Sequence, residues 1–282
     1  MSTESTITAV RGADRQINYV AVRNWLLDAL TVSSGAVDSI SFLGLGKVFT
    51  AFMTGNVAFL GMGIGGTTGA NIYGVVAPRI VSVLAAMTGF AAGIYLATKI
   101  VTPSRQPAAH EGEQPNDVVW SRRTTFALGV SLLAHVCFVL IWFATNARPG
   151  ANVVPVLLAV WAVAMGIQSA AARQLKVAGI FTTAATATFI FLVSAVATGQ
   201  PITSDERRRM RGVLVSLVTG ATIGGLLLIH TPLYAPVLPL AITIGVVATA
   251  AKVFRYREPN AGVAGGDPIG RVILRQRDDV SL

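Results

Sequence analysis

Two aspartates within an apolar stretch are the first candidates for chemistry. Asp28 and Asp38 are the charged residues of an apolar segment that runs from about residue 24 to 45. A carboxylate inside a membrane costs several kcal/mol unless it is paired, protonated or hydrated. Ten residues of continuous helix separate the two groups by about 15 Å, so they do not form a close dyad. Asp38 lies deeper in the segment and is the stronger candidate for a functional or paired group. Asp28 follows Arg23 closely and is explained equally well as an anchor at the membrane surface.

The next apolar segment carries a polar triplet, Thr54, Gly55 and Asn56. Thr54 and Asn56 offer hydrogen-bond donors and acceptors that could replace water around a polar solute, and Gly55 lets backbone groups approach closely. The alternative is that these side chains form hydrogen bonds between helices, as small polar residues do in many membrane bundles.

Polar residues of the second half extend this candidate site. Gln168 lies near the end of the fifth apolar segment, and a threonine-rich run follows with Thr182, Thr183 and Thr186. Candidate charge partners are Asp28, Lys47 and Arg173. Arg173 could pair with an acidic side chain or an anionic substrate, or it could be an anchor that snorkels from a helix end.

The common signatures of enzymes and metal proteins are absent from the sequence. The three histidines, His110, His135 and His230, do not have metal-ligand spacing, so we expect no bound metal and no cofactor. No nucleophile elbow, zinc-protease helix or Walker loop is present, and an enzyme is not expected. Transport would therefore be passive or driven by a gradient.

Composition places the chain in a membrane. Of 282 residues, 53% are hydrophobic and 12% are charged, which is about half the charged share of a typical soluble domain. The mean hydropathy is +0.63. Basic residues beside apolar spans account for the net charge of +9. The expected partner is therefore membrane lipid and not a nucleic acid.

The apolar segments predict an all-α, polytopic transmembrane bundle. A helix needs about 20 residues to cross the hydrocarbon layer, and the second, sixth and seventh segments are short or marginal. The segments lie at about 24–45, 48–64, 80–101, 124–144, 153–172, 180–198, 212–229 and 233–253.

The distribution of Lys and Arg favours six spans over eight. Eight crossings with a cytoplasmic amino terminus place 15 basic residues inside and 7 outside. If the second and sixth segments enter and leave on the same side, the count becomes 19 against 3, as cytoplasmic loops require. We therefore expect a single transmembrane domain over residues 23–257 in the inner membrane, with cytoplasmic tails at 1–22 and 258–282.

The two halves of the domain, about 24–144 and 153–253, indicate an internal repeat. Thr54 matches Thr186, Asp38 falls opposite Gln168, and a GxxxG pattern at Gly89 and Gly93 recurs at Gly220 and Gly224. Chance similarity between Ala-, Gly- and Val-rich helices is the alternative. With three spans in each half the repeat would be inverted, an arrangement that recurs in transporters with a site near the midplane. The glycine patterns themselves indicate close helix packing.

The run from Gly35 to Gly61 resembles the signature of the YoaK-like family of bacterial membrane proteins. The matching pieces are Gly35-x-x-Asp38-Ser39, Phe49 and Thr54-Gly55-Asn56, and a weaker match follows at Gly166-x-Gln168-Ser169. The resemblance implies about six membrane spans and brings no established substrate.

Two functions follow from these patterns. The first is a small-solute transporter or channel whose central polar site contains Asp38, Thr54 and Asn56. The second is a non-transporting membrane scaffold or regulator in which the same residues only hold helices together. Either is compatible with a homo-oligomer.

Overall fold

Helices make up nearly all of the computed structural model. It describes residues 18–67, 71–72, 75–76, 78–102, 120–175, 185–198 and 203–254. Within these ranges the helices are α1 (Tyr19–Gly44), α2 (Met53–Met62), α3 (Ile80–Val101), α4 (Arg122–Ala144), α5 (Val154–Arg173), α6 (Ala185–Thr198), α7 (Ser204–His230) and α8 (Val237–Val253). A π-helical turn, Gly63–Thr67, follows α2, and β1 (Asn71–Ile72) pairs with β2 (Val75–Val76) in a two-residue antiparallel hairpin.

Helix length and hydropathy confirm the polytopic all-α membrane fold. In the part of the chain that the structure describes, five helices are long and apolar enough to cross a membrane, namely α1, α3, α4, α5 and α7. The apolar helix α8 has 17 residues, close to the length that a span needs. In contrast, α2 has 10 residues and α6 has 14, too few to cross the hydrocarbon layer. This pattern of six longer and two short helices agrees with the expected one.

Several helix ends differ from the expected ones for local reasons. Helix α7 starts at Ser204, eight residues before the apolar segment, because Thr203 and Glu206 form a capping box that precedes the arginine run at residues 207–209. Helix α1 starts at Tyr19 because the side chain of Asn18 accepts the amide of Ala21. Helix α2 starts at Met53 rather than near residue 48, because the preceding residues reverse the chain.

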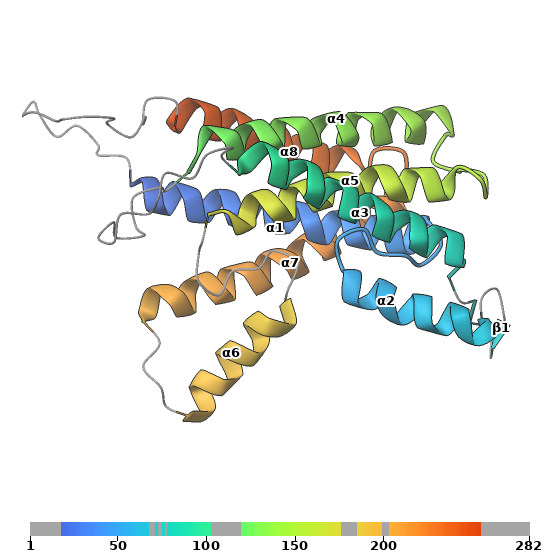
Figure 1. Cartoon of the computed structure of the whole chain (residues 1–282), viewed down its shortest axis with the longest axis horizontal. Coiled ribbons are helices and arrows are strands. Elements are labelled where there is room, and N and C mark those ends of the chain that lie inside the picture. Colours follow the sequence, from blue (N-terminus) through green and yellow to red (C-terminus); the bar gives the residue numbers. More distant parts are fainter. Residues whose placement is uncertain are drawn as a thin grey trace, which may run out of the picture.

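The six long helices alternate in direction (Figure 1). At one end of the molecule, Arg79 donates to the carbonyl of Ala151 at 3.0 Å and Trp142 donates to that of Pro232 at 3.0 Å. At the opposite end, the ring of Phe254 contacts the ring of Tyr19. The ends of these helices therefore gather at two opposite ends of the bundle, as expected for helices that cross a membrane.

Glycines create the two tightest helix contacts, α1 with α7 and α3 with α5. A Cβ on any glycine of either GxxxG pattern would collide with the backbone of the facing helix, so the predicted close packing is present. Gly220 and Gly224 of α7 face Val32 and Ala36 of α1, and Gly89 and Gly93 of α3 face Ala159 and Val163 of α5.

Buried apolar side chains fill the interior between α1, α3, α4, α5 and α8 in two clusters. One includes Phe138, Trp142 and Trp161, and the rings of Phe138 and Trp161 stack with centroids 3.6 Å apart. The other includes Leu26 and Phe254 at the opposite end. Helix α7 contributes much less to this interior. Only 17% of the residues in its most apolar stretch are buried, compared with 61% for α1.

Candidate functional site

The chain breaks sharply between α1 and α2. Gly46 and Lys47 both adopt positive φ, at 86° and 62°, and the amide of Lys47 donates to the carbonyl of Phe42 at 2.9 Å. After this turn the chain runs back along α1, so that α2 starts alongside the helix rather than beyond its end (Figure 1). Thr50 and Ala51 consequently lie beside Asp38, about two turns inside the end of α1.

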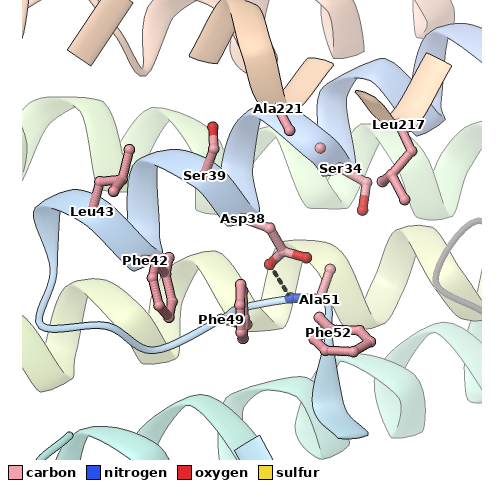
Figure 2. A pocket seen from close by; sticks show the side chains of 11 residues that line it. Ser34, Asp38, Ser39, Phe42, Leu43, Phe49, Ala51, Phe52, Leu217 and Ala221 are labelled. Atoms are coloured by element: carbon pink, nitrogen blue, oxygen red, sulfur yellow. Dashed lines mark hydrogen bonds between the residues drawn. The ribbon is translucent and has the colours of Figure 1, made fainter. Parts of the chain in front are cut away.

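The Asp38 carboxylate holds residues 45–52, the segment that runs back along α1 and is here called the returning segment. Its Oδ1 accepts the amides of Thr50 at 2.9 Å and Ala51 at 2.8 Å, and the Thr50 hydroxyl lies 3.5 Å away (Figure 2). These amides immediately precede α2 and have no partner within the helix. A carboxylate at a helix amino terminus accepts such amides and interacts favourably with the helix dipole. Asp38 therefore fixes where α2 begins.

The Asn56 side chain fixes the same segment from the other side. Its Nδ2 donates to the carbonyl of Phe49 at 2.6 Å, and its Oδ1 accepts the Phe49 amide at 3.1 Å. Asn56 is completely buried, so this one amide group satisfies both backbone groups of Phe49. Residues 49–51 are thus held in place between Asp38 and Asn56.

A cavity of about 410 Å³ lies between α1, α7 and the returning segment. Its wall is largely apolar, and Asp38 is the charged residue among those that line it. Figure 2 shows Asp38 projecting from α1 toward Ala51, with Leu217 and Ala221 of α7 on the other side. The lining residues are Ser34, Gly35, Asp38, Ser39, Phe42, Leu43, Phe49, Ala51, Phe52, Leu217 and Ala221.

Three phenyl rings form one side of this cavity. The rings of Phe42 and Phe49 stack with centroids 4.7 Å apart, and the ring of Phe52 meets Phe49 edge-on at 5.2 Å. Gly55 makes room for them, since a Cβ there would lie 2.8 Å from the ring of Phe52 and 3.0 Å from that of Phe49. Gly55 therefore admits aromatic rings rather than the backbone groups expected from the sequence.

The other predicted site residues lie elsewhere. Thr54 and Lys47 are exposed, and neither lines the cavity. Arg173 is exposed at the carboxyl-terminal end of α5, at the opposite end of the bundle from the α1–α2 turn (Figure 1). Asp28 is half-buried and packs against Gly212 of α7.

The predicted site residues of the second half do not reach the cavity where their positions are described. Gln168 is buried, and its Nε2 donates to the carbonyl of Leu30 at 2.9 Å, about two turns of α1 away from Asp38. Thr182 and Thr183 lie outside the described residues, and Thr186 is placed only as part of the backbone of α6.

Sequence reasoning missed the aromatic wall. Phe42 follows Asp38 by four residues, a spacing that puts both on one face of a helix, and this signal could have found it. Phe52 and the α7 residues carried no comparable signal. Within the described residues, no three His, Cys, Asp or Glu side chains are grouped to hold a metal ion.

Comparison with known proteins places this architecture in a family. A family model described as "Protein of unknown function (DUF1275)" matches residues 26–250. The chain belongs to this family. It is also 33% identical to the UPF0700 transmembrane protein YoaK of Bacillus subtilis (strain 168) over 176 residues, which cover 62% of this chain and 68% of that protein. No solved structure matches the chain.

Proposed function

We propose that this membrane protein is a small-solute transporter or channel, and that the cavity beside Asp38 is part of the solute path. The observation that carries the proposal is that Asp38, an ionisable side chain on the spanning helix α1, lines a cavity. An ionisable residue within a membrane span usually marks a pathway or a binding site, because leaving it there without a function is costly.

The break before α2 supports the same proposal. Irregular backbone at membrane depth is tolerated where protein or a cavity surrounds it, and transporters commonly place their sites at such discontinuous helices. The inverted repeat predicted from the sequence fits this architecture. Helices α1 and α5 run in opposite directions, as do α3 and α7 (Figure 1), and both pairs of partners pack through glycines.

The charge distribution suggests which end faces the cytoplasm. Among the described residues, the end of the molecule with the α1–α2 turn carries the basic residues Lys47, Arg79 and Arg148. The opposite end carries a larger set, which includes Arg122, Arg123, Arg173, Arg207, Arg208, Arg211 and Lys252. Under the positive-inside rule this second end, where the described chain starts and stops, lies in the cytoplasm.

A flux measurement tests the proposal. Purified protein is reconstituted into proteoliposomes, and osmotic swelling is followed by light scattering with glycerol, urea, methylammonium chloride and tetramethylammonium chloride. We expect wild type to admit at least one of these solutes faster than protein-free liposomes do. Asp38→Asn should return that rate toward the protein-free value, since it removes the charge and keeps the Oδ1 acceptor that holds Thr50 and Ala51.

Asp28→Asn is the matched control, because Asp28 lies on the same helix and does not line the cavity. Its flux should equal that of wild type. Equal swelling of wild-type and protein-free vesicles for every solute would reject transport of this solute class, and equal swelling of wild type and Asp38→Asn would reject a role for the carboxylate.

One observation favours the scaffold alternative. Asp38 and Asn56 both direct hydrogen bonds to the backbone of residues 49–51, which is a structural task. On this alternative, Asp38→Asn lowers the melting temperature in detergent and changes no flux.

A further inference from the structure

The cavity combines one carboxylate with apolar and aromatic walls. Asp38 is the charged residue among the residues that line it, and Ser34 and Ser39 are the hydroxyl-bearing ones. The Ser39 hydroxyl already donates to the carbonyl of Ala36 at 3.1 Å. A negative charge among such apolar walls is best stabilised by an opposite charge that enters with the ligand.

The geometry leaves part of the carboxylate available. The amides of Thr50 and Ala51 both donate to Oδ1. The Phe52 amide also interacts with the carboxylate. Figure 2 draws the hydrogen bond from Ala51 to one oxygen and none to the other. The amides of Thr50, Ala51 and Phe52 offset part of the cost of desolvating a carboxylate here, and a cation that enters the cavity would offset more of it.

The aromatic wall selects the kind of cation. Phe42, Phe49 and Phe52 present phenyl rings to the same space as Asp38 (Figure 2). Ring faces attract cations, and recognition of quaternary ammonium groups by clustered aromatic rings is the best-known use of this attraction. An inorganic divalent cation would need about six or more oxygen ligands, which this wall does not supply.

We propose that the cavity between α1, α7 and residues 45–52 binds an organic monocation, a substituted ammonium group whose charge faces Asp38 and whose carbon groups contact the phenyl rings. The volume of about 410 Å³ falls in the range of pockets for small organic molecules. This inference rests on the proposed function, for which it names the class of solute.

Equilibrium binding of radiolabelled phenyltrimethylammonium to the full chain in phosphatidylglycerol nanodiscs tests the inference. We expect saturable binding that unlabelled phenyltrimethylammonium displaces. Its uncharged isostere tert-butylbenzene and the anion benzenesulfonate should not displace it. Absence of saturable binding, or equal displacement by tert-butylbenzene, would overturn the inference.

Two variants locate the binding site. Asp38→Asn should weaken binding at least about tenfold, as loss of one member of a desolvated charge pair does. Phe42→Leu should weaken it about two- to thirtyfold through the lost ring, and it leaves every hydrogen bond of Asp38 in place. The controls are Asp28→Asn and Phe126→Leu, which lie outside the cavity wall and should bind as wild type does. Variants that bind no worse than these controls would overturn the assignment to this cavity.

The source of the ammonium group is tested by lipid composition. In phosphatidylcholine nanodiscs, unchanged affinity identifies a soluble cation, whereas weakened affinity identifies competition by the lipid headgroup, and both outcomes retain an ammonium site. Comparison with the swelling assay separates the two proposals. Solute flux without cation binding overturns the monocation inference alone, and cation binding without flux of any tested solute overturns transport alone.

Discussion

At the residue scale, Asp38 and Asn56 act as a pair although no hydrogen bond joins them directly. Asp38 holds the amides of Thr50 and Ala51, and Asn56 holds both backbone groups of Phe49. Buried backbone groups need partners because each unpaired one is costly away from water. The two side chains supply those partners where the helical pattern is interrupted.

This role predicts how substitutions near the break affect stability. Asn56→Ala should lower the free energy of unfolding by about 1–3 kcal/mol, because it leaves buried backbone groups of Phe49 without a partner. Thr54→Ala is the matched control two residues earlier, since Thr54 is exposed and should change stability by less than about 0.5 kcal/mol. Reversible unfolding in mixed micelles measures both, and a Thr54→Ala loss as large as that of Asn56→Ala would contradict this role.

At the element scale, glycines determine which helices pack together. Gly224 lies so close to α1 that a Cβ would be 2.7 Å from the Cα of Ala36. Such contacts let two helices approach at backbone distance, which is the main way in which membrane helices associate. The α1–α7 contact also sets the cavity, because Leu217 and Ala221 line it from α7.

A glycine scan along α7 tests this packing. Gly220→Ala and Gly224→Ala should each lower the free energy of unfolding by about 1–3 kcal/mol, since the added methyl group overpacks the interface. In Gly225→Ala the new methyl meets only Leu43, at an ordinary 3.7 Å, so a much smaller change is expected. Unfolding in mixed micelles is again the measurement, and a Gly225→Ala loss as large as the other two would show that overpacking against α1 is not the cause, because helix propensity alone favours alanine at all three positions.

The same glycine contacts bear on the predicted repeat. The glycines of α3 and α7 correspond at an offset of 131 positions, whereas their partners on α5 and α1, such as Ala159 and Val32, correspond at 127. The sequence comparison instead placed Asp38 opposite Gln168, an offset of 130. Asp38 and Gln168 also have different partners, loop amides for one and the carbonyl of Leu30 for the other. Gly35 and Gly166 correspond at 131, however, while their partners Ala221 and Ile94 correspond at 127, so the glycine contacts do not fix one register and the inverted repeat stays a prediction.

At the scale of the whole molecule, the alternating helices give the protein one end with few basic residues and one end with many, among the described residues. Arg79 and Arg148 lie at the end with the α1–α2 turn, and Arg173 and Lys252 lie at the other (Figure 1). All four are exposed, and Arg148 and Arg173 belong to loops or helix ends that the sequence marks as polar.

Cysteine labelling tests this arrangement. In a Cys137→Ala background, Arg79→Cys and Arg148→Cys should react with an impermeant maleimide on one side of sealed vesicles, and Arg173→Cys and Lys252→Cys on the other. The positive-inside rule predicts that the second pair is cytoplasmic. Labelling of Arg148→Cys and Arg173→Cys from the same side would contradict the six-span arrangement.

The sequence by itself determined the membrane location, the helical class, the pattern of long and short segments and the presence of the Asp38 carboxyl group within the first span. These features depend on hydropathy and charge along a continuous chain, which each segment carries independently of its neighbours. Only the tertiary structure decided the partners of Asp38. The turn at Gly46 and Lys47 brings Thr50 and Ala51, which lie 12 and 13 positions after Asp38 in the sequence, back to its carboxylate. Helix α7, nearly 180 positions after Asp38, closes the cavity. Such contacts leave no periodic pattern, because they depend on how separate helices pack and on where the chain reverses.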